Sequence, residues 1–242
     1  TRLRPHTLTT PKPLIKLAGK TIVQRLVEEI SASFEEPINN IGFVVGDFGT
    51  EVEKDLIKIA ENLGANGHIF YQDRPLGTAH AVLCAEKIMT GSCVIAFADT
   101  LFKSDFNINK SADGTIWVKQ IDDPSSFGVV KLDNDIITDF VEKPDVFVSD
   151  LAIIGIYHVK DSSILKGEIE FLIDNNIKDK GEYQLTNALE NMKNKNYKFS
   201  AAEVQEWLDC GNKDATCYTN QRVLFHQKNN VDQTSQIINC EI

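Results

Sequence analysis

The sequence predicts an α/β fold, with a mostly parallel mixed sheet flanked by helices and an inserted antiparallel sub-sheet. Over the first hundred or so residues, segments with helical spacing of apolar residues alternate with short continuous apolar runs. That alternation is typical of βαβ units. After Phe102 the strand-like segments follow one another closely, which indicates antiparallel pairing. A chain of 242 residues is long enough for one large domain with a sizeable core.

The N-terminal half begins with a helix predicted within residues 19–33. Ile22, Leu26 and Ile30 recur there at helical spacing and form one apolar stripe. The apolar run at 41–45 ends at a glycine and predicts a buried strand. The same patterns predict the remaining elements of this half, which are a helix at 50–63, a strand at 68–71, a helix at 78–87 and a strand at 93–98.

Strands predominate in the middle of the chain. Segments 127–132 and 136–141 are separated by Asp133-Asn134-Asp135, whose residue types favour a hairpin turn. The other predicted elements are strands at 115–121, 152–159 and 197–202 and helices at 164–173, 185–192 and 213–225. We therefore predict one domain over residues 1–226, followed by a polar linker and a strand-like fragment over 227–242.

Composition limits the kind of partner. The formal net charge of −10 argues against general binding to nucleic acid or an anionic membrane, because binding to either would need a basic face on the protein. No apolar run approaches the roughly 20 residues of a membrane span. The five cysteines include no C-x-x-C pair, so we expect reduced thiols in a cytoplasmic protein rather than zinc ligands or disulfides.

The opening segment T-R-L-R-P-H-T-L-T-T-P-K-P-L concentrates cations among prolines. Pro11 and Pro13 have a fixed φ angle and should hold Lys12 in a stiff, extended backbone. A cation in a rigid position, such as Lys12 and with it Arg2, suits contact with a phosphate during reaction. The alternative interpretation is a solvated basic loop.

Gln72, Gly77 and Thr78 lie between a predicted strand and a predicted helix. Gly77 allows close approach to the backbone, and the free N–H groups of a helix start can bind an anion. Gln72 can pair with the amide or imide edge of a nucleobase. An ordinary helix cap is the alternative.

Two aspartates are candidate ligands of a divalent cation. Asp99 follows a predicted buried strand, where open α/β sheets bind ligands. A carboxylate there could hold Mg²⁺ together with phosphate oxygens. A single aspartate rarely suffices, so a second is expected, and Asp209 in W-L-D-C-G-N is the candidate. Each aspartate could instead cap a turn or a helix.

Glu142 and Lys143 end another predicted strand. Because successive side chains in a strand point to opposite faces, we expect no ion pair between them. A carboxylate there could accept sugar hydroxyls and an ammonium group could meet a sugar phosphate. A solvent-exposed strand end is the alternative.

Five separated segments, taken in chain order, resemble those of the sugar-1-phosphate nucleotidylyltransferases. T-R-L-R-P…P-K-P-L is similar to the family signature, and Q-D-R-P-L-G-T-A-H-A-V to its nucleobase segment. F-A-D-T-L-F and W-L-D-C-G-N resemble the two metal segments, and I-T-D-F-V-E-K-P resembles the sugar-binding strand. The resemblance covers nearly the whole chain. It implies a Rossmann-like, GT-A-like nucleotidyltransferase fold in which the inserted antiparallel sub-sheet binds the sugar.

The resemblance implies a site with four parts. These are catalytic cations (Arg2, Lys12), nucleotide-binding residues (Gln72, Gly77, Thr78), sugar-phosphate-binding residues (Gly128, Glu142, Lys143) and Mg²⁺ ligands (Asp99, Asp209). The implied reaction joins a nucleoside triphosphate to a sugar 1-phosphate and releases pyrophosphate, with glucose 1-phosphate and dTTP or UTP as the expected substrates. Such phosphoryl chemistry depends on positioning and electrostatics more than on a covalent nucleophile.

The sequence departs from the family pattern in three places. The family's first strand and Gly-rich loop would precede Thr1, the first metal segment has Ala98 where glycine is usual, and no polar residue directly precedes Gly155. The fragment at 237–242 could begin the β-helix that longer relatives carry.

Two other functions are alternatives to this enzyme. The first is an inactive regulatory subunit that binds a nucleotide sugar. The second, a Rossmann-type oxidoreductase, lacks the expected G-x-G-x-x-G after a strand. The sequence leaves open the base, the sugar, an allosteric site and whether the chain forms a homo-oligomer.

Overall fold

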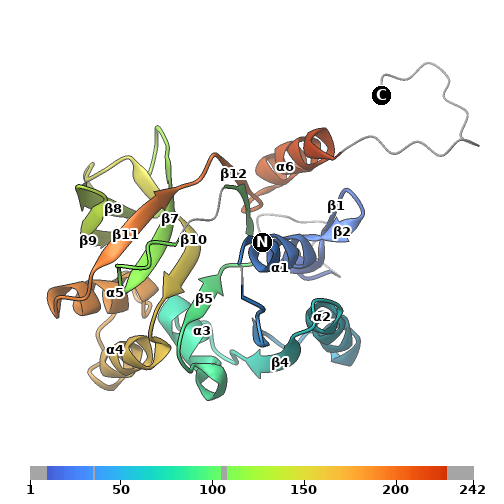
Figure 1. The fold of residues 1–242 in the computed structure, drawn as a ribbon, viewed down its shortest axis with the longest axis horizontal. Coiled ribbons are helices and arrows are strands. Elements are labelled where there is room, and N and C mark those ends of the chain that lie inside the picture. The colour runs from blue at the N-terminus through green and yellow to red at the C-terminus, as the bar shows by residue number, and fades with distance from the viewer. Residues whose placement is uncertain (1–9, 35, 105–107, 228–242) are drawn as a thin grey trace, which may run out of the picture.

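A computed structural model describes residues 10–34, 36–104 and 108–227 of the chain (Figure 1). Helices and strands alternate through the first part, and strands predominate in the middle. The elements are, in order, η2 (Lys12–Leu14), β1 (Lys16–Leu17), β2 (Lys20–Thr21), α1 (Ile22–Ser33), β3 (Asn40–Val45), α2 (Thr50–Asn62), β4 (Asn66–Tyr71), α3 (Thr78–Cys84), η3 (Glu86–Ile88), β5 (Cys93–Ala96), β6 (Thr100–Lys103), β7 (Gly114–Gln120), β8 (Gly128–Asp133), β9 (Ile136–Glu142), β10 (Leu151–Val159), α4 (Ser162–Asp174), α5 (Leu185–Asn194), β11 (Phe199–Glu203), β12 (Glu206–Asp209) and α6 (Lys213–His226).

The central sheet has six strands in the order β5-β10-β7-β11-β9-β8. The mixed α/β architecture is confirmed, but it holds fewer parallel pairs than expected. Among the described strands, β7–β11 and β3–β4 are parallel, whereas β5–β10, β7–β10, β8–β9 and β6–β12 are antiparallel. The reason is that β10 returns from the antiparallel region and lies between β5 and β7, so the predicted sub-sheet is continuous with the first part of the fold.

The predicted hairpin between β8 and β9 is confirmed. Asn134 and Asp135 both have positive φ angles, of 49° and 65°. Two consecutive left-handed residues match the twist of the flanking strands, and Asn and Asp tolerate that conformation better than most residues. The hairpin places Gly128 opposite Glu142 in the register of the two strands.

Strand β10 contains an irregularity that affects the segment before Asp99. Its register with β7 shifts between Ile153 and Tyr157, and Gly155 in between has a φ of +85°. The Gly155 carbonyl accepts the N–H of Phe97 at 2.9 Å, and a β-carbon built on Gly155 would lie 3.0 Å from the Phe97 ring. The glycine therefore lets the chain pass close to β10 just before Asp99.

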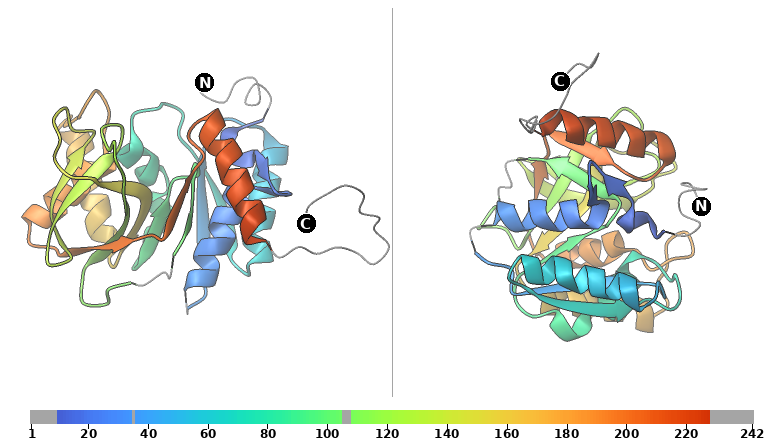
Figure 2. Two further views of the ribbon diagram at one scale, coloured as in Figure 1. Left: turned by 90° about the horizontal axis from the view of Figure 1, so that it is seen from above. Right: turned by 90° about the vertical axis from the view of Figure 1, so that its right-hand side faces the viewer.

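The core lies on both faces of the central sheet. On one face, α4 and α5 bury Leu165, Ile169 and Leu189 completely. On the other, Ile22 of α1 packs in one cluster with the fully buried Trp117 of β7. Helices α1 and α6 lie side by side in Figure 2 and line one cavity together with β6 and β12. The β6–β12 pair is thus covered by two helices.

Two further properties bear on the composition-based expectations. Cys84, Cys93, Cys210 and Cys217 are free thiols. Within the described ranges, no helix combines the length and apolar character needed to cross a membrane.

The core assignment predicts the effect of Leu189→Ala. Leu189 of α5 is fully buried in the core, so shortening its side chain to a methyl group leaves a cavity. We expect the free energy of unfolding to fall by about 2–5 kcal/mol in urea titrations. Leu224→Ala is the control, because Leu224 on α6 is half exposed and should change stability by less than about 0.5 kcal/mol. Equal effects of the two substitutions would contradict the assigned core.

Candidate active site

Lys12 and Asp99 form an ion pair at the centre of the candidate site. The Lys12 ammonium lies 2.8 Å from Asp99 Oδ2. Pro11 is extended as expected, but Lys12 itself begins a single-turn 3-10 helix rather than continuing an extended backbone. Pro13 is compatible with that turn, because the first turn of a helix needs no N–H donor from it. The rigid placement predicted for Lys12 is therefore achieved by a tight turn.

Asp209 completes a cluster with this pair. It is the last residue of β12 and lies opposite Thr100, the residue after Asp99, in the β6–β12 register. Asp209 Oδ1 accepts the N–H of Gly211 at 2.8 Å. Burial raises the pKa of Asp209, the nearby Asp99 carboxylate raises it further, and the Gly211 N–H and Lys12 oppose the rise. The structure thus brings together the two aspartates and the lysine that the sequence singled out.

This donor set fits a hard divalent cation. One or two carboxylates commonly hold Mg²⁺ where the metal is shared with substrate phosphates. Within the described ranges no cluster of three or more His, Cys, Asp or Glu side chains could hold a metal. Burial raises the pKa of the adjacent Cys210 thiol to about 12.

The loop around Gly77 packs tightly against the backbone of a distant segment. A β-carbon on Gly77 would lie 2.4 Å from the Tyr183 carbonyl oxygen, and Gly77 has a φ of +118°. The N–H of Ala79, in the first turn of α3, donates to the same carbonyl at 2.9 Å. One of the helix-start N–H groups expected to be free for an anion is therefore engaged within the protein. The glycine serves chain packing here.

Gln72 and Thr78 also make contacts inside the protein. Gln72 Nε2 lies 3.0 Å from the Gly77 carbonyl and 3.1 Å from His80 Nδ1. Thr78 Oγ1 donates to Gln184 Oε1 and accepts the N–H of Leu185. The Thr78 hydroxyl therefore joins the loop to the start of α5, and a nucleobase contact by Gln72 stays a prediction.

Glu142 and Lys143 form an ion pair, contrary to the expectation from strand geometry. Lys143 Nζ lies 3.2 Å from Glu142 Oε1. The reason is that β9 ends at Glu142 and Lys143 has a φ of +40°, so the alternation of side chains stops between them. The Lys143 N–H donates to the Phe127 carbonyl at 3.1 Å, which supports this unusual backbone.

Thr186, which was not predicted from the sequence, orients the Glu142 carboxylate. Thr186 Oγ1 donates to Glu142 Oε2 at 3.0 Å. A β-carbon on Gly128 would lie 3.1 Å from both Glu142 Oε2 and Thr186 Cγ2, so Gly128 leaves room for this contact. Thr186 lies in the first turn of α5, where its sequence pattern shows only an amphipathic helix.

Two parts of the site border one another. Trp207 Nε1 donates to Thr100 Oγ1 at 2.7 Å, beside Asp99, and the Trp207 ring meets Phe127 at 4.9 Å between centroids. Phe127 holds Lys143 through its carbonyl. Trp207 and Phe127 thus link the carboxylate cluster to the Glu142–Lys143 pair. Arg2 lies outside the described residues.

Comparison with known proteins identifies the family of the chain. The family model described as "Nucleotidyl transferase" matches residues 1–224. The chain belongs to the nucleotidyl transferase family. Among its relatives is the mannose-1-phosphate guanylyltransferase catalytic subunit beta of Drosophila melanogaster, 34% identical over 180 residues, or 70% of this chain and 48% of that protein. The bifunctional protein GlmU of Methanococcus maripaludis is 33% identical over 218 residues, or 87% of this chain and 49% of that protein.

Solved structures of the nucleotidyl transferase family share the fold. A nucleoside-diphosphate-sugar pyrophosphorylase from Vibrio cholerae RC9 has a TM-score of 0.75 at 18% identity, covering 89% of this chain and 93% of that one. A UDP-glucose pyrophosphorylase complexed with UDP-glucose has a TM-score of 0.73 at 21% identity, covering 93% of this chain and 95% of that one. The expected fold class is thereby confirmed. The chain spans about half the length of the two curated relatives above.

The close approach at Gly77 predicts a large effect of Gly77→Ala. The new methyl group would overlap the Tyr183 backbone, and the alanine would have to keep the positive φ of Gly77. We expect the free energy of unfolding to fall by about 2 kcal/mol or more. Gly64→Ala is a matched control, since Gly64 has a φ of +78° but nothing within 4 Å of the added carbon; it should cost about 1 kcal/mol. If both variants unfold at the same urea concentration, the packing argument is wrong.

Proposed function

We propose that the chain is a sugar-1-phosphate nucleotidylyltransferase, which converts a nucleoside triphosphate and a sugar 1-phosphate into a nucleotide sugar and pyrophosphate. The observation that carries the proposal is the meeting of Lys12 with Asp99 and Asp209. A cation and two metal-binding carboxylates at one point suit a reaction in which negative phosphate charge must be neutralised. Membership of the nucleotidyl transferase family supports the same reaction class.

In the proposed reaction an oxygen of the sugar phosphate attacks the α-phosphorus of the nucleotide. The new O–P bond forms while the bond from the α-phosphorus to the bridging oxygen breaks, and pyrophosphate leaves with that electron pair. Mg²⁺ held by Asp99 and Asp209 would neutralise charge on the phosphates. Lys12, together with Arg2, would contact the triphosphate, and Lys12 would leave Asp99 for it. Positioning and charge neutralisation are the main protein contributions to such a step.

The remaining predicted residues are assigned to substrate recognition. Gln72 and the Gly77–Thr78 turn would contact the nucleotide. Glu142 would accept hydroxyls of the sugar, since its carboxylate is already oriented by a buried donor. Lys143, whose side chain is less buried than that of Glu142, would bind the sugar phosphate. Gly128 would allow the sugar to approach the strand.

Glucose 1-phosphate with dTTP or UTP is the first choice of substrates, on the sequence resemblance of the nucleobase and sugar segments. Mannose 1-phosphate with GTP is the second. It is favoured by the 34% identity to proteins named mannose-1-phosphate guanylyltransferase.

A regulatory subunit that binds a nucleotide sugar without turning it over is the alternative function. Such a protein has no need of two carboxylates for a metal. The presence of Lys12, Asp99 and Asp209 in one cluster therefore favours an enzyme.

The proposal predicts pyrophosphate release by the full-length protein with Mg²⁺ and one combination from a panel of nucleotides and sugar 1-phosphates. Chelation with EDTA should abolish the release. Asp99→Asn should lower kcat at least about 100-fold, because it removes charge that holds the cation. Asp133→Asn, at the exposed end of β8, should leave kcat unchanged. No release from any pair by a folded protein that binds nucleotide would favour the regulatory function instead.

A further inference from the structure

Helix α6 contacts the backbone of Asp209 directly. Thr219 Oγ1 donates to the Asp209 carbonyl at 2.7 Å, and Thr219 is fully buried. Thr216, one turn earlier on the same helix, donates to the carbonyl of Asn212, four residues before it, at 2.6 Å, and lies 3.3 Å from the Cys210 carbonyl. A buried hydroxyl in a helix commonly bonds within its own helix in this way. The Thr219 hydroxyl thus bonds outside its helix, to the candidate metal ligand.

The Asp209 backbone is in turn tied to Asp99. The N–H of Cys210 donates to the Asp99 carbonyl at 2.9 Å. The Asp209 carboxylate is held by the N–H of Gly211 at 2.8 Å. A displacement of the Asp209 carbonyl would therefore alter both the direction of its own carboxylate and its spacing from Asp99.

The neighbouring residue of α6 fixes the segment that follows Lys12. Asn220 Oδ1 accepts the N–H of Ala18 at 2.9 Å. Ala18 has a φ of +44° in the turn between β1 and β2. Consecutive residues of α6 thus bond the backbone of Asp209 and of the turn between β1 and β2, which follows Lys12.

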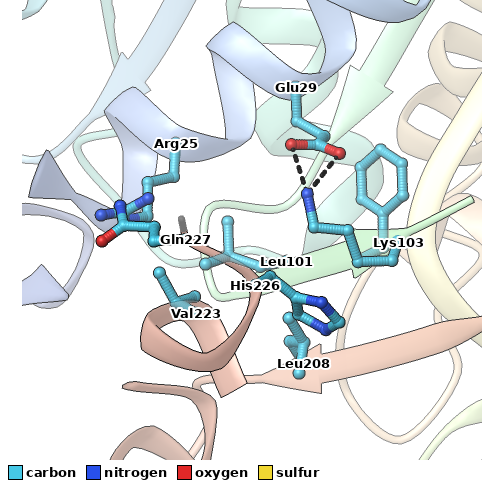
Figure 3. Close-up of a pocket in the computed structure, with 9 residues that line it drawn as sticks. Arg25, Glu29, Leu101, Lys103, Leu208, Val223, His226 and Gln227 are labelled. Atoms are coloured by element: carbon cyan, nitrogen blue, oxygen red, sulfur yellow. Dashed lines mark hydrogen bonds and ion pairs between the residues drawn. The ribbon is translucent and has the colours of Figure 1, made fainter. Parts of the chain in front are cut away.

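The far end of α6 is anchored as well. Arg222 and His226 both bond the carboxylate of Glu206, at the start of β12. Figure 3 shows Val223 and His226 beside Leu101 and Leu208, around a cavity of about 110 Å³. Helix α6 is therefore fixed along β12, and the Thr219 hydroxyl has a defined position.

We infer that Thr219 is a positioning residue, which sets Asp209 relative to Asp99 for binding a divalent cation. The inference rests on the proposed function for the identity of the ligand. It concerns a contact made through the backbone, so Thr219 itself touches neither metal nor substrate.

The test compares Thr219→Val with Thr219→Ser. Valine keeps the shape and loses the hydroxyl, whereas serine keeps the hydroxyl. Mn²⁺ binding to the full-length protein is measured by electron paramagnetic resonance in the presence of a non-hydrolysable nucleotide. We expect Thr219→Val to weaken Mn²⁺ binding roughly tenfold, the scale seen when groups behind metal ligands are removed. Thr219→Ser should stay within about twofold of the wild type.

Thr115→Val is the matched control for losing a buried hydroxyl. Thr115 is fully buried on β7, and its hydroxyl lies 3.2 Å from Ser200 Oγ, outside the candidate site. This variant should bind Mn²⁺ as the wild type does, even if its Tm falls as far as that of Thr219→Val. A purely structural role for Thr219 would make both valine variants behave alike.

Three outcomes separate this inference from the proposed function. Weaker Mn²⁺ binding by Thr219→Val supports the inference even if no sugar 1-phosphate is turned over. Unchanged Mn²⁺ binding by that variant overturns it, even if the enzyme is active. A wild-type protein that binds no Mn²⁺ with nucleotide present also overturns it, because Asp209 would then have no cation to hold.

Discussion

The close approach of two carboxylates is the constraint on which the rest of the site depends. Burial opposes ionisation of Asp209, and the nearby Asp99 carboxylate opposes it further. Like charges at short range in a partly buried place persist only when cations or N–H donors face them. In the protein without a bound cation, Lys12 faces the Asp99 carboxylate and the Gly211 N–H faces the Asp209 carboxylate. A divalent cation would add further positive charge.

The fold brings these groups together through an antiparallel pair. Strands β6 and β12 are far apart in sequence, yet their register sets Thr100 opposite Asp209. The end of the connection from α4 to α5 and the first turn of α5 contact two other parts of the site, because Tyr183 packs against Gly77 and Thr186 bonds Glu142. One short segment thus touches both the proposed nucleotide loop and the proposed sugar-phosphate pair.

Much of the fold was predictable because its elements carry local signals. Helical spacing located α1 and α2 to within a few residues, and Asp133-Asn134-Asp135 marked the β8–β9 hairpin. Strands β6 and β12 were missed because each has four residues and they are stabilised by pairing with each other, which sequence spacing does not show. The expectation that the sheet is mostly parallel was wrong, because β10 pairs antiparallel with both β5 and β7. That placement depends on partners distant in sequence.

The site was predictable at its strand ends and less so elsewhere. Asp99 was singled out because a carboxylate after a buried strand has a specific use in α/β sheets. Asp209 was singled out as the second carboxylate that a magnesium site would need, in W-L-D-C-G-N. The Glu142–Lys143 ion pair could not, because it depends on one residue with a positive φ. Thr186 and Thr219 act through contacts between segments distant in sequence, and neither residue stands out from an ordinary helix.

The most direct test of the central claim is anomalous X-ray scattering from crystals of the full-length protein soaked with Mn²⁺ and a non-hydrolysable nucleotide. The account predicts one strong manganese peak in contact with carboxylate oxygens of both Asp99 and Asp209, with the Lys12 ammonium released from Asp99 to the phosphates. A nucleotide bound at the site without manganese between these aspartates, or a peak held by other residues, would contradict it.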